Sequence, residues 1–195
     1  PKDSNRAFAF YKATEWEKLL FYPEPTLIRA LKKTEEWALV SKMAESALKS
    51  KTCPSISTMT ALGLKVEEFL INAETRESRR ALAISLYERG IQCAANESLD
   101  ALAKARYRAS LLLIWDGRWD RALPHLQKLT ERKEGDFVSR ALYWQVRAQR
   151  RSQNDKAVAS LEERLLKEFP LSFHGLLLNP AAHTKMKETV VQGDP

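Results

Sequence analysis

The chain has 195 residues, which is enough for one domain or one extended array of repeats and too few for a second large domain. Alanine and leucine dominate the apolar residues, and only 6 glycines and 8 prolines are present, so a fold built on β-sheets and their turns is excluded. With 44% hydrophobic residues, 29% charged residues and a formal net charge of +7, the composition predicts a soluble, mostly helical protein with anionic partners.

The first half of the chain contains segments in which apolar residues recur at helical spacing. Pro23 and Pro25 end the first of them, and Thr26 is the expected N-cap of the second, which breaks near Cys53. The expected helices are 7–21, 26–51, 57–73 and 76–94. Either Ser98 or Asp100 is expected to cap the helix that follows.

The two cysteines, Cys53 and Cys93, lie 40 positions apart. Neither has a second cysteine or a histidine at metal-ligand spacing, so no metal site is expected. A disulfide is compatible with the sequence. However, free cysteine packs as a small hydrophobe, and we expect two unpaired, partly buried thiols.

The second half of the chain is self-similar at an offset of 35 to 36 residues. The segments 105–107 and 120–123 recur as 141–143 and 155–158. Each unit reads as two antiparallel helices around a tight turn and resembles a tetratricopeptide repeat. Such hairpins bury their apolar faces by stacking on one another. We therefore predict an all-α fold, an α-superhelix of stacked helix hairpins over residues 1–178.

Two repeat units carry this prediction most clearly, at 101–134 and 137–178. In the first turn Gly117 permits the helix to end, whereas the second turn has Gln153-Asn154, with Asn154 as the expected left-handed residue. Residues 179–195 read as a linker or tail. The aromatic residues at repeat positions are expected to be core wedges: Tyr107, Trp115, Trp119 and Tyr143.

Several classes of chemistry find no support in the sequence. His125, His174 and His183 form no metal-binding pair, and no phosphate-binding glycine loop or nucleophile motif is present. Adjacent glutamates such as Glu67-Glu68 point about 100° apart on a helix and are expected to be solvated. The longest apolar run, 111–115, is too short to span a membrane. No catalytic residue, metal or cofactor is predicted.

One basic stripe suggests binding. Arg140, Arg147 and Arg151 are spaced i, i+7 and i+11 on the helix that also carries Trp144, so they share one face. A guanidinium group suits a carboxylate or phosphate, and a neighbouring aromatic ring can lie on the face of a sugar. The alternative is a solvated helix face with Trp144 buried between hairpins.

The same two interpretations apply to Arg76, Arg79 and Arg80. Each of these arginines either belongs to a binding stripe or lies on a solvated helix face.

The closing hairpin carries a resemblance to a known family. It opens with Arg-Ala-Leu-Tyr-Trp at 140–144 and closes with Phe-Pro-Leu-Ser-Phe-His-Gly-Leu at 169–176. This pattern resembles the last repeats of the α-superhelical domain of soluble lytic murein transglycosylases, and the match extends over about 101–178. It departs from the family at His174, where tyrosine is the commoner residue.

The resemblance implies a periplasmic protein whose superhelical domain accompanies a lysozyme-like domain towards the C-terminus. That domain cleaves the β-1,4 bond of peptidoglycan with one glutamate, acting as acid and then base, and forms a 1,6-anhydro product. The family pairs Glu-Ser with a downstream Gly-Leu-Met-Gln segment, and the Glu-Ser pairs at 45–46, 77–78 and 97–98 lack it. No catalytic residue is therefore carried over to this chain, and whether the chain belongs to an enzyme is left open.

The expected function is that of a non-catalytic superhelical domain that binds or guides peptidoglycan glycan strands and positions a catalytic domain outside these residues. The residues expected to bind the ligand are Arg140, Trp144, Arg147 and Arg151. A first alternative is a helical-repeat scaffold that binds an acidic peptide or a protein partner. A second is a basic helical-repeat RNA binder, consistent with a pI near 9.4. Nucleic acid is the least favoured partner, because the aromatic residues recur at packing positions and no repeated base-reading pair is visible.

Overall fold

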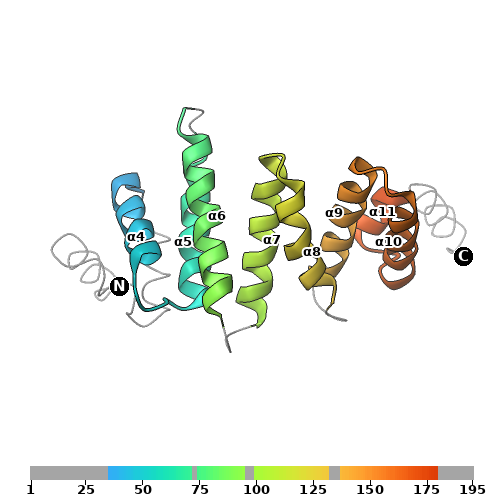
Figure 1. Ribbon diagram of the computed structural model, residues 1–195, viewed down its shortest axis with the longest axis horizontal. Helices are drawn as coiled ribbons and strands as arrows, with labels where there is room; N and C mark the ends of the chain where they lie inside the picture. The colour runs from blue at the N-terminus through green and yellow to red at the C-terminus, as the bar shows by residue number, and fades with distance from the viewer. Residues whose placement is uncertain (1–34, 72–73, 95–98, 132–136, 180–195) are drawn as a thin grey trace, which may run out of the picture. The chain divides into compact units, whose positions relative to one another are not determined.

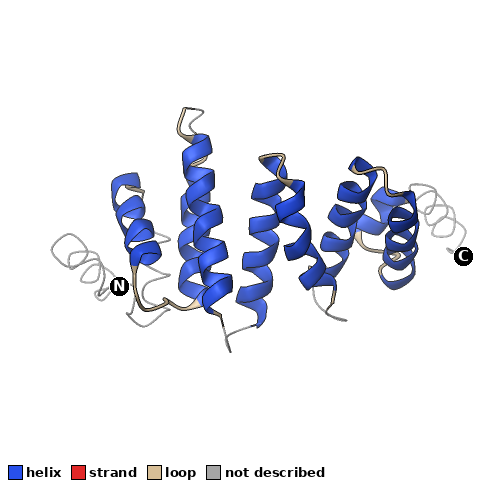
Figure 2. Ribbon diagram, viewed as in Figure 1, coloured by secondary structure: helices blue, strands red, loops and turns tan. Residues whose placement is uncertain are grey.

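The computed structural model describes residues 35–71, 74–94, 99–131 and 137–179. Every regular element in these residues is a helix, and Figure 2 shows only helices and the loops that join them. The predicted all-α fold is confirmed. The chain divides into two compact units, Pro1–Gly117 and Arg118–Pro195, each of which packs on its own core.

The first unit contains four described helices: α4 (Trp37–Lys49), α5 (Ile56–Glu68), α6 (Arg76–Cys93) and α7 (Leu99–Trp115). Helix α5 packs against α6 and α7, and α4 packs against α5 and α6 (Figure 1). The apolar period explains this arrangement, since α4 buries Leu39, Met43 and Ala47 on one face.

The sequence predicted one helix over 26–51, and this predicted start is wrong. Helix α4 begins at Trp37, because Glu36 is extended, with φ −92° and ψ 107°, and its carbonyl accepts the first helical hydrogen bonds from Leu39 and Val40. No proline or glycine lies at this break, and the helical spacing of apolar residues continues across it, so the sequence pattern did not indicate where the helix begins. The expected helix 7–21 and the cap Thr26 lie outside the described residues.

The start of α5 and both ends of α6 agree with the sequence to within one residue. Helix α5 begins one residue before the expected 57–73 segment, because the Ser55 hydroxyl accepts from the Thr58 amide at 3.1 Å, and it ends early, at Glu68. Helix α6 matches the expected 76–94 segment. Asp100 lies in the first turn of α7 and does not cap it, whereas Ser98 lies outside the described residues.

Helices α5 and α6 approach each other closely at two glycines. A Cβ atom added to Gly63 would lie 2.6 Å from two carbon atoms of the Tyr87 ring, and one added to Gly90 would lie 2.8 Å from the Met59 Cβ. Only glycine leaves room for these contacts. At each of these two points the backbone of one helix packs directly against a buried side chain of the other helix.

A buried polar network joins α5, α6 and α7. The Tyr87 hydroxyl donates to Glu67, and Arg108 donates to both oxygens of the same carboxylate, with its Nε 3.0 Å from Oε1. Burial and then the charge of Glu67 raise the pKa of Tyr87 far above its ordinary value. Burial is the largest single effect on the pKa of Arg108 and lowers it, but the hydrogen bonds and charges of Glu67 and Tyr87 together raise the pKa above its ordinary value.

The sequence predicted that Glu67, like its neighbour Glu68, would be solvated, and for Glu67 this prediction is wrong. Its side chain is 7% exposed, and the three-helix contact that buries it comes from residues distant in sequence. Glu68 is exposed, as expected.

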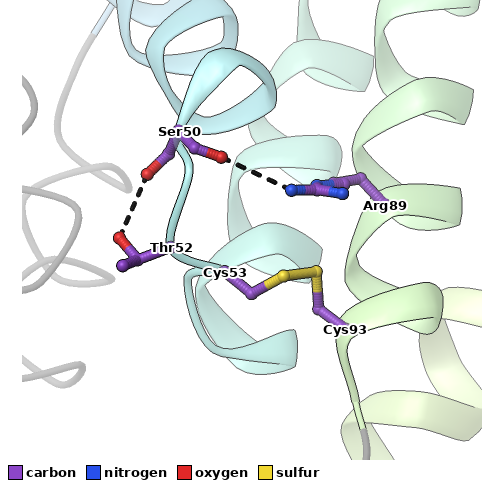
Figure 3. Close-up of a disulfide and its surroundings, with 5 residues drawn as sticks. All are labelled: Ser50, Thr52, Cys53, Arg89 and Cys93. Carbon is purple, nitrogen blue, oxygen red and sulfur yellow. Dashed lines mark hydrogen bonds between the residues drawn. A yellow bond between two sulfur atoms is a disulfide. The ribbon is translucent and has the colours of Figure 1, made fainter.

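The two cysteines form a disulfide, and the prediction of free thiols is wrong (Figure 3). Cys53 precedes α5 and Cys93 ends α6. Because the two helices are antiparallel, the start of one lies beside the end of the other, with the two Cα atoms 5.8 Å apart. Beside the bond, Arg89 donates to the carbonyl of Ser50 at 3.4 Å, which ties the end of α4 to α6.

The second unit contains α8 (Trp119–Thr130), α9 (Val138–Arg151), α10 (Asp155–Glu168) and the short α11 (Phe173–Leu178). Helix α9 packs against α8, α10 and α11. Its core is built on Val138, Leu142 and Leu165, with partly buried residues packed around them: Tyr143, Leu161, Phe169 and Leu178.

A buried amide fixes α9 against α8. The Gln145 side-chain nitrogen donates to the Leu126 carbonyl at 3.1 Å and to the Thr130 hydroxyl at 3.0 Å. This position satisfies both donors of the amide in an otherwise apolar contact.

The two predicted repeat turns differ in their outcome. Gly117 has φ 73°, and its amide donates to the Ile114 carbonyl at 2.9 Å, so the predicted helix exit is confirmed. In the second turn the left-handed residue is Gln153, with φ 56°, and not Asn154. Asn154 instead caps α10, because its side-chain oxygen accepts from the Ala157 amide at 3.3 Å.

Within each unit, each described helix packs against the next one along the chain, as a hairpin array requires. A superhelical path over residues 1–178 stays a prediction. Among the expected aromatic wedges, Trp115 is wrong: it is the last residue of α7 and 60% exposed, whereas Tyr107, Trp119 and Tyr143 are partly buried.

Candidate functional site: an arginine and aromatic surface on the second unit

The stripe predicted from sequence lies on the solvent side of α9. The opposite side of this helix is buried and includes Leu142, Gln145 and Val146. Arg140, Arg147 and Arg151 are exposed, and Trp144 is partly buried. The helix therefore brings together all four residues predicted to bind a ligand, on the face left open by its own packing.

Two of the arginines rest on aromatic rings. The Arg147 guanidinium carbon lies 6.0 Å from the centre of the Tyr143 ring, and its Nη1 donates to the Tyr143 hydroxyl at 3.1 Å. The Arg151 guanidinium carbon lies 5.9 Å from the centre of the Trp119 ring. Within the described residues, neither guanidinium meets a carboxylate, so both keep donors available for an anion.

Neighbouring arginines are used differently. Arg150 pairs with Glu162 of α10. Arg164 donates to Glu168 at 3.0 Å and to the Thr130 carbonyl at 2.9 Å, which links α10 to the end of α8. These guanidinium groups hold the unit together and are not candidates for ligand binding.

The rings beside the arginines continue in an unbroken series, which we name the aromatic strip. Its members, in spatial order, are Trp119, Trp144, Tyr143, His174 and Phe173. The centres of successive rings lie 6.4, 5.5, 5.2 and 5.4 Å apart, and every pair is tilted or edge-to-face. The strip draws residues from α8, α9 and α11.

The turn before α11 explains how its two rings are held. The Ser172 hydroxyl accepts from the Gly175 amide at 3.0 Å and donates to the Phe169 carbonyl at 2.9 Å. A Cβ atom on Gly175 would lie 2.5 Å from that same carbonyl oxygen. The segment that carries the family resemblance is thus a capped turn, and it sets His174 against Tyr143.

His174 lies within the aromatic strip and has a shifted pKa. Burial, and then the positive charge of Arg140, lower the pKa of His174 below its ordinary value. The imidazole is therefore neutral at neutral pH, and the strip presents it as a ring and not as a cation.

Only part of this site was predicted from the sequence. The helical spacing identified Arg140, Trp144, Arg147 and Arg151, because they share one helix. Trp119 and Tyr143 were assigned to the core, and His174 and Phe173 were not assigned to the site. The signal for the last two was the Ser-x-x-Gly cap at 172–175, which fixes a short helix that leaves Phe173 exposed.

The arginines of α6 have structural partners. Arg76 donates to the Leu70 carbonyl at 3.1 Å, and Arg79 donates to the Phe69 carbonyl at 2.6 Å, so both satisfy carbonyls that follow α5. Arg79 also lies 4.3 Å from the Trp37 ring centre, and Arg80 pairs with Asp116. Arg79 and Arg80 are partly buried and connect elements of the first unit, whereas Arg76 lies exposed on its helix, as the solvated-face interpretation predicted.

No group of three or more His, Cys, Asp or Glu side chains in the described ranges is arranged to hold a metal ion. No helix of the described part of the chain combines the length and apolar character needed to cross a bilayer. His125 is partly buried in α8, and His183 lies outside the described residues.

Comparisons of the chain with protein-family models, with curated proteins and with solved structures found no match. The resemblance to the lytic transglycosylases accordingly stays a prediction from the sequence motifs at 140–144 and 169–176.

Proposed function

We propose that this chain is the non-catalytic helical-repeat domain of a periplasmic lytic transglycosylase and that it binds the glycan strands of peptidoglycan. The sequence resemblance over 101–178 suggests the family. It implies a lysozyme-like catalytic domain elsewhere in the same protein, which this domain would present with its substrate.

The disulfide between Cys53 and Cys93 supports the proposed compartment. Structural disulfides persist where the environment is oxidising, as in the bacterial periplasm, and are rare in a reducing cytosol. The same argument disfavours RNA, which is a cytosolic ligand, as the anionic partner.

The observation that carries the proposal is the pair Arg147 and Arg151 on the open face of α9. Each guanidinium is exposed, is oriented by an aromatic ring and is without a carboxylate among the described residues. Peptidoglycan offers what this pair recognises, because muramyl groups and stem peptides carry carboxylates beside sugar rings. A guanidinium can bind a carboxylate with two parallel hydrogen bonds.

Co-sedimentation with purified peptidoglycan tests the proposal. We expect the wild-type chain to sediment with the polymer and R147E/R151E to lose at least about tenfold in affinity, since each reversal removes a charge-assisted hydrogen bond. The matched control is K156E/K167E, which changes the net charge equally at two exposed lysines of α10. This control should bind nearly as wild type.

Two results would contradict the proposal. The first is a wild-type chain that stays in the supernatant at low salt. The second is an equal loss of binding by both double variants, which would reduce the attraction to net charge alone. Retention of an acidic peptide with no retention of peptidoglycan would instead favour the scaffold alternative.

A further inference from the structure

We propose that the ligand surface extends from α9 onto α11 and that it recognises an acidic glycan at two points. Arg147 and Arg151 bind its carboxylates, and Phe173, at the other end of the aromatic strip, packs against the apolar face of a sugar. This inference rests on the proposed function and adds a binding residue, Phe173, that lies outside the predicted stripe.

The position of Phe173 is the first argument. The residue is 69% exposed, although α11 packs against α9 and α10 and buries Gly175. The capped turn holds the start of this helix through the bonds of Ser172 to Gly175 and Phe169. A large ring is thus presented to solvent from a fixed backbone, which limits the conformational entropy lost when a ligand covers it.

The continuity of the rings is the second argument. Phe173 meets His174 edge-to-face at 5.4 Å, and His174 meets Tyr143 at 5.2 Å. Tyr143 in turn holds the Arg147 guanidinium through its hydroxyl. Contacts between neighbouring rings therefore link the Arg147 guanidinium to the exposed Phe173 within one unit.

The distribution of charge is the third argument, and it points to the class of ligand. Guanidinium groups contact Trp119 and Tyr143, whereas Phe173 has His174 as its ring partner. A polymer that carries acidic groups on some of its sugars and bare C–H faces on others matches both ends. A peptide that is acidic throughout would leave the Phe173 end without a complementary group.

Binding of two soluble probes to the full chain tests this inference. The acidic probe is an oligomer of alternating N-acetylglucosamine and N-acetylmuramic acid without stem peptides, and the neutral probe is chitohexaose. We expect tighter binding of the acidic probe. In R147Q/R151Q its affinity should fall to that of the neutral probe, because the carboxylates lose their partners.

The variant F173A isolates the new residue. We expect it to weaken the binding of both probes by about two- to tenfold, the effect of removing one aromatic contact. Since Phe173 is largely exposed, the thermal unfolding temperature should not change. The matched control is W115A, which removes another exposed aromatic side chain, from the first unit, and should leave both affinities unchanged.

The possible failures separate the two proposals. If the wild-type chain binds neither probe nor intact peptidoglycan, the proposed function fails. If it binds the acidic probe and F173A binds equally well, the extension onto α11 is overturned while the proposed function stands. Tighter binding of an acidic peptide or of single-stranded RNA than of either glycan would overturn the assigned class of ligand.

Discussion

The arginines of α9 show how the nearest neighbours of a side chain decide its role. Arg150 and Arg151 are adjacent in sequence, but successive side chains on a helix point about 100° apart. Arg150 consequently pairs with Glu162 of α10, whereas Arg151 lies over Trp119 with its donors open. The same chemical group serves packing at one position and is available to a ligand at the next.

His174 predicts a pH dependence of stability. Its pKa is lowered in the folded chain, so the unfolded chain binds the proton more readily. The stabilising contribution is therefore full above the unfolded value of about 6.5 and decreases as the pH falls from there through the lowered folded value. We expect the unfolding temperature of wild type to fall more steeply between about pH 7 and 5 than that of H174Q. Parallel pH profiles of the two proteins would show that His174 is not the source.

At the scale of elements, glycine permits the closest helix contact in the first unit. Gly63 faces the ring of Tyr87, and that ring has little freedom to move, because its hydroxyl is bonded to Glu67 within the network that also holds Arg108. The packing of α5 on α6 and the polar network of Tyr87, Glu67 and Arg108 thus depend on one another.

The variant G63A tests this contact. Overpacking should cost about 1–3 kcal/mol, only partly offset by the gain of up to about 1 kcal/mol from alanine in a helix. We expect a net loss in the free energy of unfolding, measured by urea denaturation. If alanine raised the stability, as it does in an open helix position, the close approach of α5 and α6 would be refuted.

The elements were more predictable from sequence than the contacts between them. Apolar spacing predicted α6 and the start of α5 to within one residue, and the cap signals at Ser172 and Gly117 are local. The disulfide and the pairing of Glu67 with Arg108 join residues 40 and 41 positions apart, and no pattern of spacing reports which distant residues meet. The same distinction holds for the site. The residues of α9 were predictable because they share one helix, whereas Trp119 and Phe173 join the strip only through the packing of α8 and α11 on α9.

At the scale of the molecule, the disulfide should be a main source of stability for the first unit. Closing a 40-residue loop restricts the unfolded chain, and we expect C53S/C93S to lose about 2–4 kcal/mol in the free energy of unfolding. Wild type measured with a reducing agent should match the double variant, and the variant should not respond to that agent. A variant as stable as oxidised wild type would show that the bond does not restrict the unfolded chain.

The cysteine bond also determines how the chain carries mechanical tension. Force along the backbone passes from Cys53 directly to Cys93, so the stretch between them, about 140 Å when fully extended, bears no load. Helices α5 and α6 lie within that shielded stretch, whereas α4 and α7 lie outside it. A chain pulled from its two ends would therefore unfold first in the segments outside the disulfide and would keep α5 and α6 folded between them.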